Sequence, residues 1–549
     1  MSKHLNSLAL ICAFAAACGG GGPPCTAGQA CTATAACRTG VISCSTGAAV
    51  CVDSGNVPDG TACASGGTCQ AGTCKRTVSG TFQAIHWTDD GTKTTVSGTP
   101  SFSFAQSDPP ASPSALLVPD ATTTGYTRIP LAIAADQSFA VPSVPVGPYL
   151  LELDATTSGV AVCNAVATPV PIVDLFELTS SNPDLAYVTY ARPDVVTPQI
   201  APNVTFDITN MDPWVSGDRL FVASSQARTF QIILPVPAGG ATSLSPTFGW
   251  FGGLPDASKN DSVFVYQRTA GTIGSGNDVS SLARVTKSAQ LTNLTVVEGS
   301  NASTAVALGD TPQTGSLSTD LRSSQFAALA ADVNPGAVLN SFSVTVLAVP
   351  HSTTYPDKPF AQSFSMFSLV GTSAADVNYG SVAYGQFFDA HWKEERRVVY
   401  LFDVPSEASS ATLFSSQSVA DLTAGGVTPV IGPPKTPQVN GANAFAAQTG
   451  VGLQPTISWS APALGTATSY VVDVVAASPC SLNGQVAGVS AVIRSGTSFK
   501  VPPGILIPGR AYRATITARQ APWDTANAGP FRTGTPLHSA QCVTSTFVP

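Results

Sequence analysis

Charge is scarce in this chain of 549 residues. Only 11% of the residues are Asp, Glu, Lys or Arg, less than half of the roughly 25% that is usual in globular proteins. The formal net charge is −8, whereas a nucleic-acid-binding protein needs a basic surface. Hydrophobic residues make up 44% of the chain, which excludes the polar composition of a disordered protein. We therefore expect a folded protein with no nucleic acid among its partners.

Histidine is also rare, with five residues in the whole chain, so few general bases are available for catalysis. The sequence contains no Gly-x-Ser-x-Gly, His-Glu-x-x-His or phosphate-binding glycine-loop pattern. By contrast, 48 glycines and 43 prolines punctuate the chain and disfavour long helices. At roughly 100–150 residues per domain, the length corresponds to about four domains. The composition predicts a mainly β protein of several domains that is not an enzyme and holds no cofactor.

The first 17 residues have the pattern of an export signal. A short segment with one positive charge precedes Leu5–Ala17, which is apolar apart from two residues and shorter than the about 20 residues that span a bilayer. Small residues come directly before Cys18, and glycines and prolines follow it. This arrangement resembles the bacterial lipobox, which implies a signal peptide over 1–17, a lipid on Cys18 and a flexible tether over 18–24. Ordinary secretion with cleavage nearby is the alternative.

The same resemblance bears on location. Gly19 follows the cysteine in place of the Asp that retains bacterial lipoproteins at the inner membrane, so we expect the outer membrane or the cell surface. No other stretch approaches 18 uninterrupted apolar residues, so we expect no transmembrane helix. The lipid is therefore the expected contact with the membrane, and the side of the membrane, extracellular or periplasmic, stays open.

Cysteine is concentrated near the N-terminus. A segment this rich in cysteine cannot build its own hydrophobic core, and an even number of cysteines in an exported protein predicts a disulfide framework. Zinc sites need paired Cys-x2-4-Cys spacings, and only the last gap fits, so we expect no metal. The connectivity stays open. The eight cysteines are Cys25, Cys31, Cys37, Cys44, Cys51, Cys63, Cys69 and Cys74.

Two stretches of this segment carry a family pattern. Residues 59–63 read Asp-Gly-Thr-Ala-Cys, and residues 69–74 read Cys-Gln-Ala-Gly-Thr-Cys. They resemble small Cys-rich modules of bacterial surface proteins and disintegrin-like regions. The resemblance implies a small disulfide-rich module over 25–76 and no particular ligand.

The region after this module alternates apolar and polar residues. Residues 136–153 contain Asp-Gln-Ser-Phe, then Val-Pro-Val-Gly, then Tyr-Leu-Leu-Glu-Leu. This order resembles the closing half of a carboxypeptidase regulatory-like (transthyretin-like) domain, although Ser138 replaces the turn glycine. The resemblance implies a β-sandwich over 77–165 that serves as a connector or a binding platform. Cys163 is the odd cysteine, and we expect it to be a small buried hydrophobe.

The C-terminus carries a second such pattern. Residues 455–459 read Pro-Thr-Ile-Ser-Trp, and residues 506–512 read Leu-Ile-Pro-Gly-Arg-Ala-Tyr. The order resembles fibronectin type III domains, which implies a sandwich over 431–549 whose Tyr at the end of the second stretch makes a tyrosine corner. Cys480 and Cys542 lie in this domain and are predicted to form a disulfide.

The middle of the chain is rich in strand patterns separated by turns. We expect a β-sandwich-like domain over 166–300 and a β-rich domain over 301–430, with one larger β domain as the alternative. A single helix is predicted over 319–332, because its apolar residues fall near helical spacing and Asn-Pro follows it. We find no fixed repeat period. The fold class is therefore tandem β-sandwiches, Ig-like or fibronectin III-like, after a small disulfide-rich module.

The strongest catalytic pattern is His391-x-x-Glu394, which has the spacing of the zinc pair of metallocarboxypeptidases, with His538 as a third ligand. We reject it because the histidines fall in different predicted domains and no alternating helices surround them. The run Glu394–Arg397 is interpreted as a solvated turn. Weak carboxylate clusters leave bound calcium open, since calcium needs only oxygen ligands. These clusters are Asp89 with Asp90, Asp207 with Asp212 and Asp218, and Asp256 with Asp261.

Trp214 and Trp250 lie in turn-rich stretches and are the one hint of a ligand. If exposed, they would stack on sugars; packing in the interior is the alternative. The function that we expect is a lipid-anchored surface protein of several β domains that acts as a structural, adhesion or binding module. The alternatives are a carbohydrate-binding accessory protein and a secreted hydrolase with an unrecognised site. The partner is an unknown extracellular protein or glycan.

Overall fold

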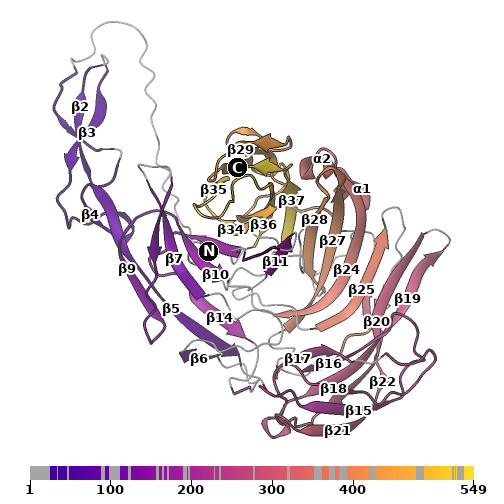
Figure 1. The fold of residues 1–549 in the computed structure, drawn as a ribbon. Coiled ribbons are helices and arrows are strands. Elements are labelled where there is room, and N and C mark those ends of the chain that lie inside the picture. Colours follow the sequence, from indigo (N-terminus) through magenta and orange to yellow (C-terminus); the bar gives the residue numbers. More distant parts are fainter. Residues whose placement is uncertain are drawn as a thin grey trace, which may run out of the picture. The chain divides into compact units, whose positions relative to one another are not determined.

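A computed structural model of the chain is built almost entirely from β-strands (Figure 1). It divides into two compact units, which we call the disulfide unit (up to Thr77, with Ser143–Val146) and the β unit (Val78–Pro142 and Gly147–Pro549). The structure describes residues 25–33, 35–45, 48–87, 93–97, 112–120, 125–155, 160–163, 166–169, 172–189, 194–195, 198–224, 226–227, 229–233, 236–275, 278–317, 322–350, 361–369, 377–382, 392–419, 427–477, 488–521, 525, 527 and 537–549.

The described part of the disulfide unit contains a small three-stranded antiparallel sheet and a hairpin. One sheet has the order β1 (Ala30–Cys31), β2 (Arg38–Ser43) and β3 (Val50–Asn56). A 3-10 turn (Ala64–Gly66) leads into β4 (Thr68–Gln70), which pairs with the start of β5 (Thr73–Trp87). Ala71 and Gly72, both with positive φ, make the tight two-residue turn of this hairpin.

The predicted disulfide-rich module is confirmed, and all eight of its cysteines are paired. Buried Cys37, Cys69 and Cys74 pack with Cys63, Val57 and Val146, so sulfur supplies most of the small core that so few apolar residues cannot. The pairs are Cys25–Cys44, Cys31–Cys51, Cys37–Cys69 and Cys63–Cys74.

The first sandwich of the β unit spans 78–189. One sheet contains the rest of β5 with β6 (Lys93–Ser97), β9 (Ser138–Pro145) and β14 (Leu185–Thr189). The other has the order β8 (Tyr126–Pro130), β7 (Ser112–Pro119), β10 (Tyr149–Ala155) and β13 (Ile172–Leu178). Because β13 and β14 complete the two sheets, this sandwich runs past residue 165. A separate hairpin is made by β11 (Val160–Cys163) and β12 (Val166–Pro169).

The second sandwich spans 203–310 and has its own core. A sheet of β18 (Thr247–Gly249), β15 (Asn203–Thr209) and β21 (Asn301–Ala307) faces β17 (Thr229–Ile232), β16 (Arg219–Ser224), β19 (Val263–Ser275) and β20 (Asp278–Leu291). A 3-10 turn (Ala257–Lys259) precedes β19, and β22 (Gly309–Asp310) pairs with β20. Val306 and Leu308 lie in this core, so the sandwich extends beyond residue 300.

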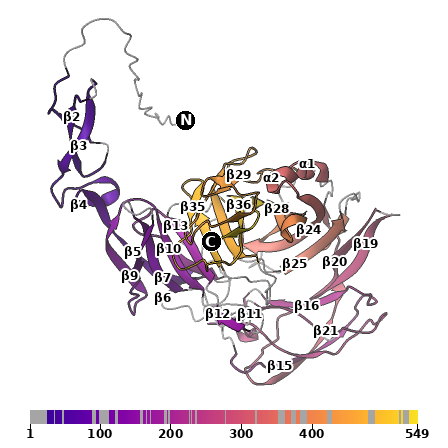
Figure 2. The same ribbon diagram turned by 45° about the horizontal axis from the view of Figure 1, so that its top comes forward.

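The next region, which we call the helix-covered sheet, spans 311–419. Its strands are β24 (Val338–Pro350), β25 (Ala361–Leu369), β27 (Trp392–Val404) and β28 (Ser409–Ser418), with a small pair made by β23 (Gly315–Leu317) and β26 (Val377–Tyr379) and a 3-10 turn (Pro405–Glu407). The predicted helix is present as two short ones, α1 (Ser323–Ala327) and α2 (Ala330–Val333), which a turn separates (Figure 2). The Phe326 ring stacks on Tyr400 at 3.6 Å between centroids, which fixes α1 on the sheet.

The C-terminal sandwich spans 427–549. One sheet has the order β30 (Ala442–Asn443), β29 (Lys435–Val439), β32 (Thr456–Ser460) and β35 (Ser498–Lys500). The other has the order β34 (Gly488–Ile493), β33 (Ser469–Ala476), β36 (Tyr512–Gln520) and β37 (His538–Val543), and β31 (Gln448–Thr449) pairs with β38 (Phe547–Val548). The expected fibronectin type III-like sandwich is therefore present.

Two predicted features of this sandwich are confirmed. The backbone N–H of Ile507 donates to the buried Tyr512 hydroxyl at 2.9 Å, which is the expected tyrosine corner. Trp459 lies in the core and meets the ring of Tyr470 edge-on at 5.1 Å between centroids.

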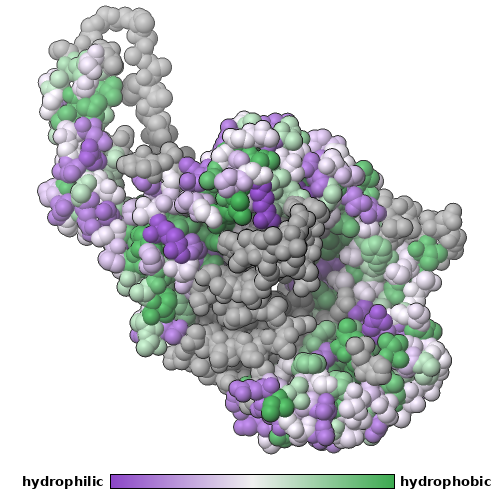
Figure 3. All heavy atoms as spheres, in the orientation of Figure 1, coloured by the Kyte–Doolittle hydropathy of each residue, from purple (hydrophilic) through white to green (hydrophobic). Residues whose placement is uncertain are grey.

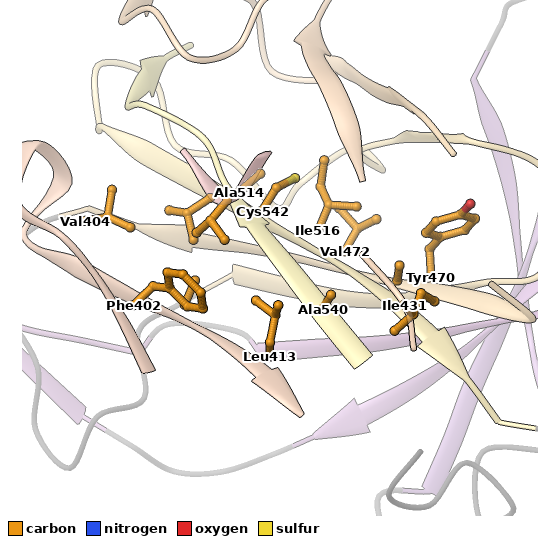
Figure 4. Packing of buried hydrophobic residues seen from close by; sticks show 14 of the residues in the cluster. Phe402, Val404, Leu413, Ile431, Tyr470, Val472, Ala514, Ile516, Ala540 and Cys542 are labelled. Atoms are coloured by element: carbon orange, nitrogen blue, oxygen red, sulfur yellow. The ribbon is translucent and has the colours of Figure 1, made fainter. Parts of the chain in front are cut away.

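One continuous sheet runs through the β unit. Within the described residues it holds 19 strands, and three pairings join segments that are far apart in the chain: β13 with β34, β28 with β37, and β20 with β25. The core of the C-terminal sandwich accordingly continues into the helix-covered sheet and reaches Leu175 of the first sandwich (Figure 4). Among the described residues, no helix has the length and hydrophobicity needed to cross a membrane.

The tyrosine corner yields a stability prediction. The substitution Tyr512→Phe removes the acceptor of the Ile507 N–H and should lower the free energy of unfolding by about 1–3 kcal/mol. The substitution Ile507→Ala is the matched control, because this exposed side chain can be shortened while its backbone N–H stays; we expect a change within about 0.5 kcal/mol. Urea unfolding of both variants measures the difference, and equal stabilities would contradict a structural role for the corner.

Candidate functional sites

The two tryptophans proposed as sugar-stacking residues are interior residues. Trp214 is 4% exposed and Trp250 is 0% exposed, and both belong to the core of the second sandwich. Trp250 Nε1 donates to the carbonyl of Gly253 at 3.0 Å, so its polar atom is also satisfied. Turn-rich sequence around these residues brings the chain back over the core instead of exposing the rings. The prediction of a stacking site is therefore wrong.

The charged run at 394–397 lies in β27, where Glu395–Arg397 are buried and Glu394 is partly buried, which corrects its interpretation as a solvated turn. The hydroxyl of Ser416 donates to Glu395 Oε2 at 2.6 Å, and Arg397 Nη2 lies 3.5 Å from the same oxygen. On the opposite face, Arg396 Nη2 donates to Gln417 Oε1 at 3.0 Å. Burial lowers the pKa of the Arg397 guanidinium, while Glu395 opposes that shift. These charges bind β27 to β28 and leave no exposed ion pair for a ligand.

Glu394 is held by three hydroxyl groups. Ser363 and Ser381 donate to its Oε1 at 2.9 and 2.6 Å, and Tyr379 donates to Oε2 at 3.1 Å. Burial, and then the neighbouring Glu394 carboxylate, raises the pKa of Tyr379. His391, its partner in the zinc pattern that the sequence argument rejected, lies outside the described residues. The geometry gives Glu394 a structural role in fastening β25, β26 and β27.

His538, the third residue of that pattern, lies in β37 opposite Ser415, with 3.1 Å between Nδ1 and the serine hydroxyl. Burial lowers the pKa of His538, so its neutral form is favoured. It packs within the sheet.

The carboxylates that left calcium open serve the turns of the second sandwich. Asp218 is fully buried, and it accepts hydrogen bonds from the Val215 and Ala270 N–H groups at 3.1 and 2.7 Å and from Gln267 Nε2 at 3.1 Å. Asp261 accepts from the N–H of Asp256 at 2.9 Å. Asp89 and Asp90 lie outside the described residues.

Among the described residues, the one cluster of ligand-type side chains close enough for a metal is Cys37, Cys63 and Cys74. All three are disulfide-bonded.

Cys542 is a free thiol in the interior of the C-terminal sandwich, where Figure 4 shows it among Ala514 and Ile516. This corrects the predicted disulfide with Cys480, which itself lies outside the described residues. Burial raises the pKa of the Cys542 thiol to about 12, so the group stays protonated and unreactive at neutral pH. Cys18 and the side chain of Cys163 also lie outside the described residues.

The most elaborate polar arrangement joins the first and C-terminal sandwiches. We call it the seam: the parallel pairing of β13 with β34, from Ile172 opposite Gly488 to Phe176 opposite Val492. At one end, buried Glu177 accepts hydrogen bonds from the backbone N–H groups of Arg494 and Ser495, the second at 2.7 Å.

Further contacts complete this end of the seam. The Ser495 hydroxyl also donates to the Glu177 carboxylate, and the Arg494 guanidinium donates to the Glu177 carbonyl. Burial, and then the charge of Glu177, raises the pKa of Tyr126 to about 12.

Sequence reasoning missed the seam. Its signal is a carboxylate inside an otherwise apolar strand: Glu177 follows Leu175-Phe176, and Asp473 interrupts Val471-Val472 and Val474-Val475. Such a residue is almost never buried without a partner. The sequence marks both acids in this way but does not reveal which distant strand supplies the partner.

Comparisons with known proteins give only loose structural alignments. No family model matches this chain, and no curated protein matches it. A two-domain fibronectin type III segment of chicken tenascin aligns at 11% identity over 51% of this chain and 99% of that chain, with a TM-score of 0.13.

Two further solved structures align in the same loose way. The FN1–FN3 domains of chicken CNTN1 align at 9% identity over 63% of this chain and 99% of that one, with a TM-score of 0.12. A tetra-tandem repeat from the extending region of a large adhesion protein aligns at 14% identity over 85% and 100%, also with a TM-score of 0.12. Superpositions this loose say nothing about function, and the fold assignment rests on the chain's own strand order.

The burial of the tryptophans makes a direct prediction. Trp250→Ala should lower the free energy of unfolding by about 3–5 kcal/mol, because it empties a packed core position. Phe251→Ala is the matched control: this adjacent ring is 58% exposed, and its loss should cost well under about 1 kcal/mol. Thermal or urea unfolding separates the two, and a Trp250 variant as stable as the Phe251 variant would show that Trp250 is not a core residue.

Proposed function

We propose that this protein is anchored at the outer membrane or cell surface by a lipid on Cys18 and acts there as a non-catalytic structural, adhesion or binding module. The observation that carries the proposal is the strand pairing through the β unit, which joins three sandwiches and the helix-covered sheet into one sheet. Such continuity suits a protein that presents surfaces in a fixed arrangement. Within the described residues, the side chains considered as candidate site residues pack in the interior or bond to neighbouring strands, and they do not converge on a shared cleft.

The disulfide unit supports an extracytoplasmic location. Four disulfides within 25–74 persist only where thiols are kept oxidised, as outside the cytoplasm. The unit follows the Gly/Pro stretch that the lipobox resemblance assigns as a tether. A cross-linked unit withstands proteolysis and unfolding better than an uncross-linked one of its size.

The surface is consistent with display in an aqueous environment. On the face that Figure 3 shows, hydrophilic, intermediate and hydrophobic residues are interspersed over the β unit. Charged residues make up only 11% of the whole chain. The partner that we propose is an extracellular protein or glycan met by the surfaces of the sandwiches.

Membrane fractionation combined with surface labelling tests this proposal. Wild-type protein in a bacterial host should fractionate with the outer membrane and react with a membrane-impermeant amine label on intact cells, whereas Cys18→Ser should lose both properties. Cys12→Ser is the matched control, because that cysteine lies in the predicted signal peptide. A membrane-bound Cys18→Ser protein would refute the lipid anchor, and labelling only after permeabilisation would refute surface display.

A further inference from the structure

Two half-buried carboxylates flank strand β34, one within the seam and one on the neighbouring strand β33. Asp174 of β13 and Asp473 of β33 are both register partners of Ser490 on the intervening strand β34. Directly opposed residues of neighbouring strands point to the same face of a sheet, so the two acids flank the Ser490 hydroxyl on one face. Strands in a sheet lie about 4.8 Å apart, which leaves the two acids only two strand spacings from each other.

The opposite face of the same strands is apolar. Leu175 of β13, Val489 and Ala491 of β34 and Val472 of β33 belong to the continuous hydrophobic core. Each strand of the seam therefore has one face in the core and one face with an acid or a hydroxyl near its middle. The two faces of a strand move together. The acids therefore cannot leave the seam unless the apolar residues on the opposite face also leave the core.

We infer that the seam is an acid-strengthened latch, in which proton uptake by Asp174 and Asp473 tightens the junction between the first and C-terminal sandwiches. The inference concerns how the two sandwiches are joined, and it does not depend on the lipid anchor or on surface display.

The electrostatics of the two acids set the sign of the effect. Burial raises the pKa of Asp174, and the neighbouring Asp473 raises it further. Burial also raises the pKa of Asp473, against smaller opposing effects of the Ser490 hydrogen bond and the Arg519 charge. A carboxyl group whose pKa is higher in the folded state binds protons on folding. Its protonated form therefore favours the closed seam, and this stabilisation is lost as the pH rises through the raised pKa values.

The other groups around the two acids do not reverse this sign. On β10, the register partner of Asp174 is Leu153, which is uncharged; Glu152 is in register with Leu175 on the other face and is bonded by Arg128. On β36, the register partner of Asp473 is Thr515, and the charge of Arg519 acts on Asp473 to lower its pKa.

Glu177 lies on the core side at the end of the seam and keeps its own clamp on Arg494 and Ser495.

Amide hydrogen exchange of the full-length protein tests the latch. Protection factors of the β34 amides, corrected for intrinsic exchange, should rise as the pH falls from about 8 to about 4, by up to tenfold for each unit by which an acid's pKa is raised. In the double variant Asp174→Asn/Asp473→Asn the charge is absent, so β34 should be as protected at about pH 8 as the wild type is at the acid end, with the pH dependence lost.

Two further variants sharpen the outcome. Asp310→Asn removes an exposed carboxylate that pairs with Lys287 away from the seam, and it should leave the β34 profile unchanged. Glu177→Gln breaks the clamp and should lower β34 protection at every pH. If the double variant does not fold, the test is the pH dependence of β34 protection in the wild type and in the single variant Asp473→Asn. Two results would overturn the inference. One is that the protection of the β34 amides in the wild type does not rise as the pH falls. The other is that a folded Asn variant keeps the same pH dependence of protection as the wild type.

Discussion

The architecture depends on one constraint: the edge of a β-sheet exposes backbone N–H and C=O groups that must find partners. In this protein both edges of the β34–β33–β36–β37 sheet of the C-terminal sandwich are satisfied by strands from elsewhere in the chain. β34 pairs with β13 on one side, and β37 pairs with β28 on the other. β25 likewise continues the sheet from the helix-covered sheet to β20 of the second sandwich. These three pairings join the four regions into one sheet, and the first sandwich, the helix-covered sheet and the C-terminal sandwich also share a core, part of which Figure 4 shows.

Side chains reinforce the junctions at the points where backbone pairing changes from one region to the next. Buried Asn334, just after α2, donates to the Val543 carbonyl at 3.0 Å and ties the helix-covered sheet to the end of β37. Glu177 performs the corresponding task at the seam, with Ser495 and Arg494 as its partners.

Local features could be predicted from the sequence, and long-range ones could not. The disulfide-rich module, the tyrosine corner of Tyr512 and the helical segment around Phe326 are each encoded within a few residues. The seam instead joins Glu177 to Arg494, which lies 317 residues further along, and no local pattern indicates that pairing. Trp250 and the charged residues that follow Glu394 are buried for a related reason. Whether a turn-rich or charged stretch is covered depends on strands that arrive from distant parts of the chain.

The central claim is that β13 and β34 pair in the register described, and disulfide trapping tests it most directly. Neighbouring strands lie about 4.8 Å apart, within the range of Cα separations of about 4.4–6.8 Å that a disulfide spans. With Asp174→Cys and Ser490→Cys in the full-length protein, mild oxidation should produce a cross-linked peptide that mass spectrometry identifies. With Asp174→Cys and Val492→Cys, which are out of register, it should not. Absence of the in-register cross-link in folded protein, or equal cross-linking of both pairs, would contradict the account.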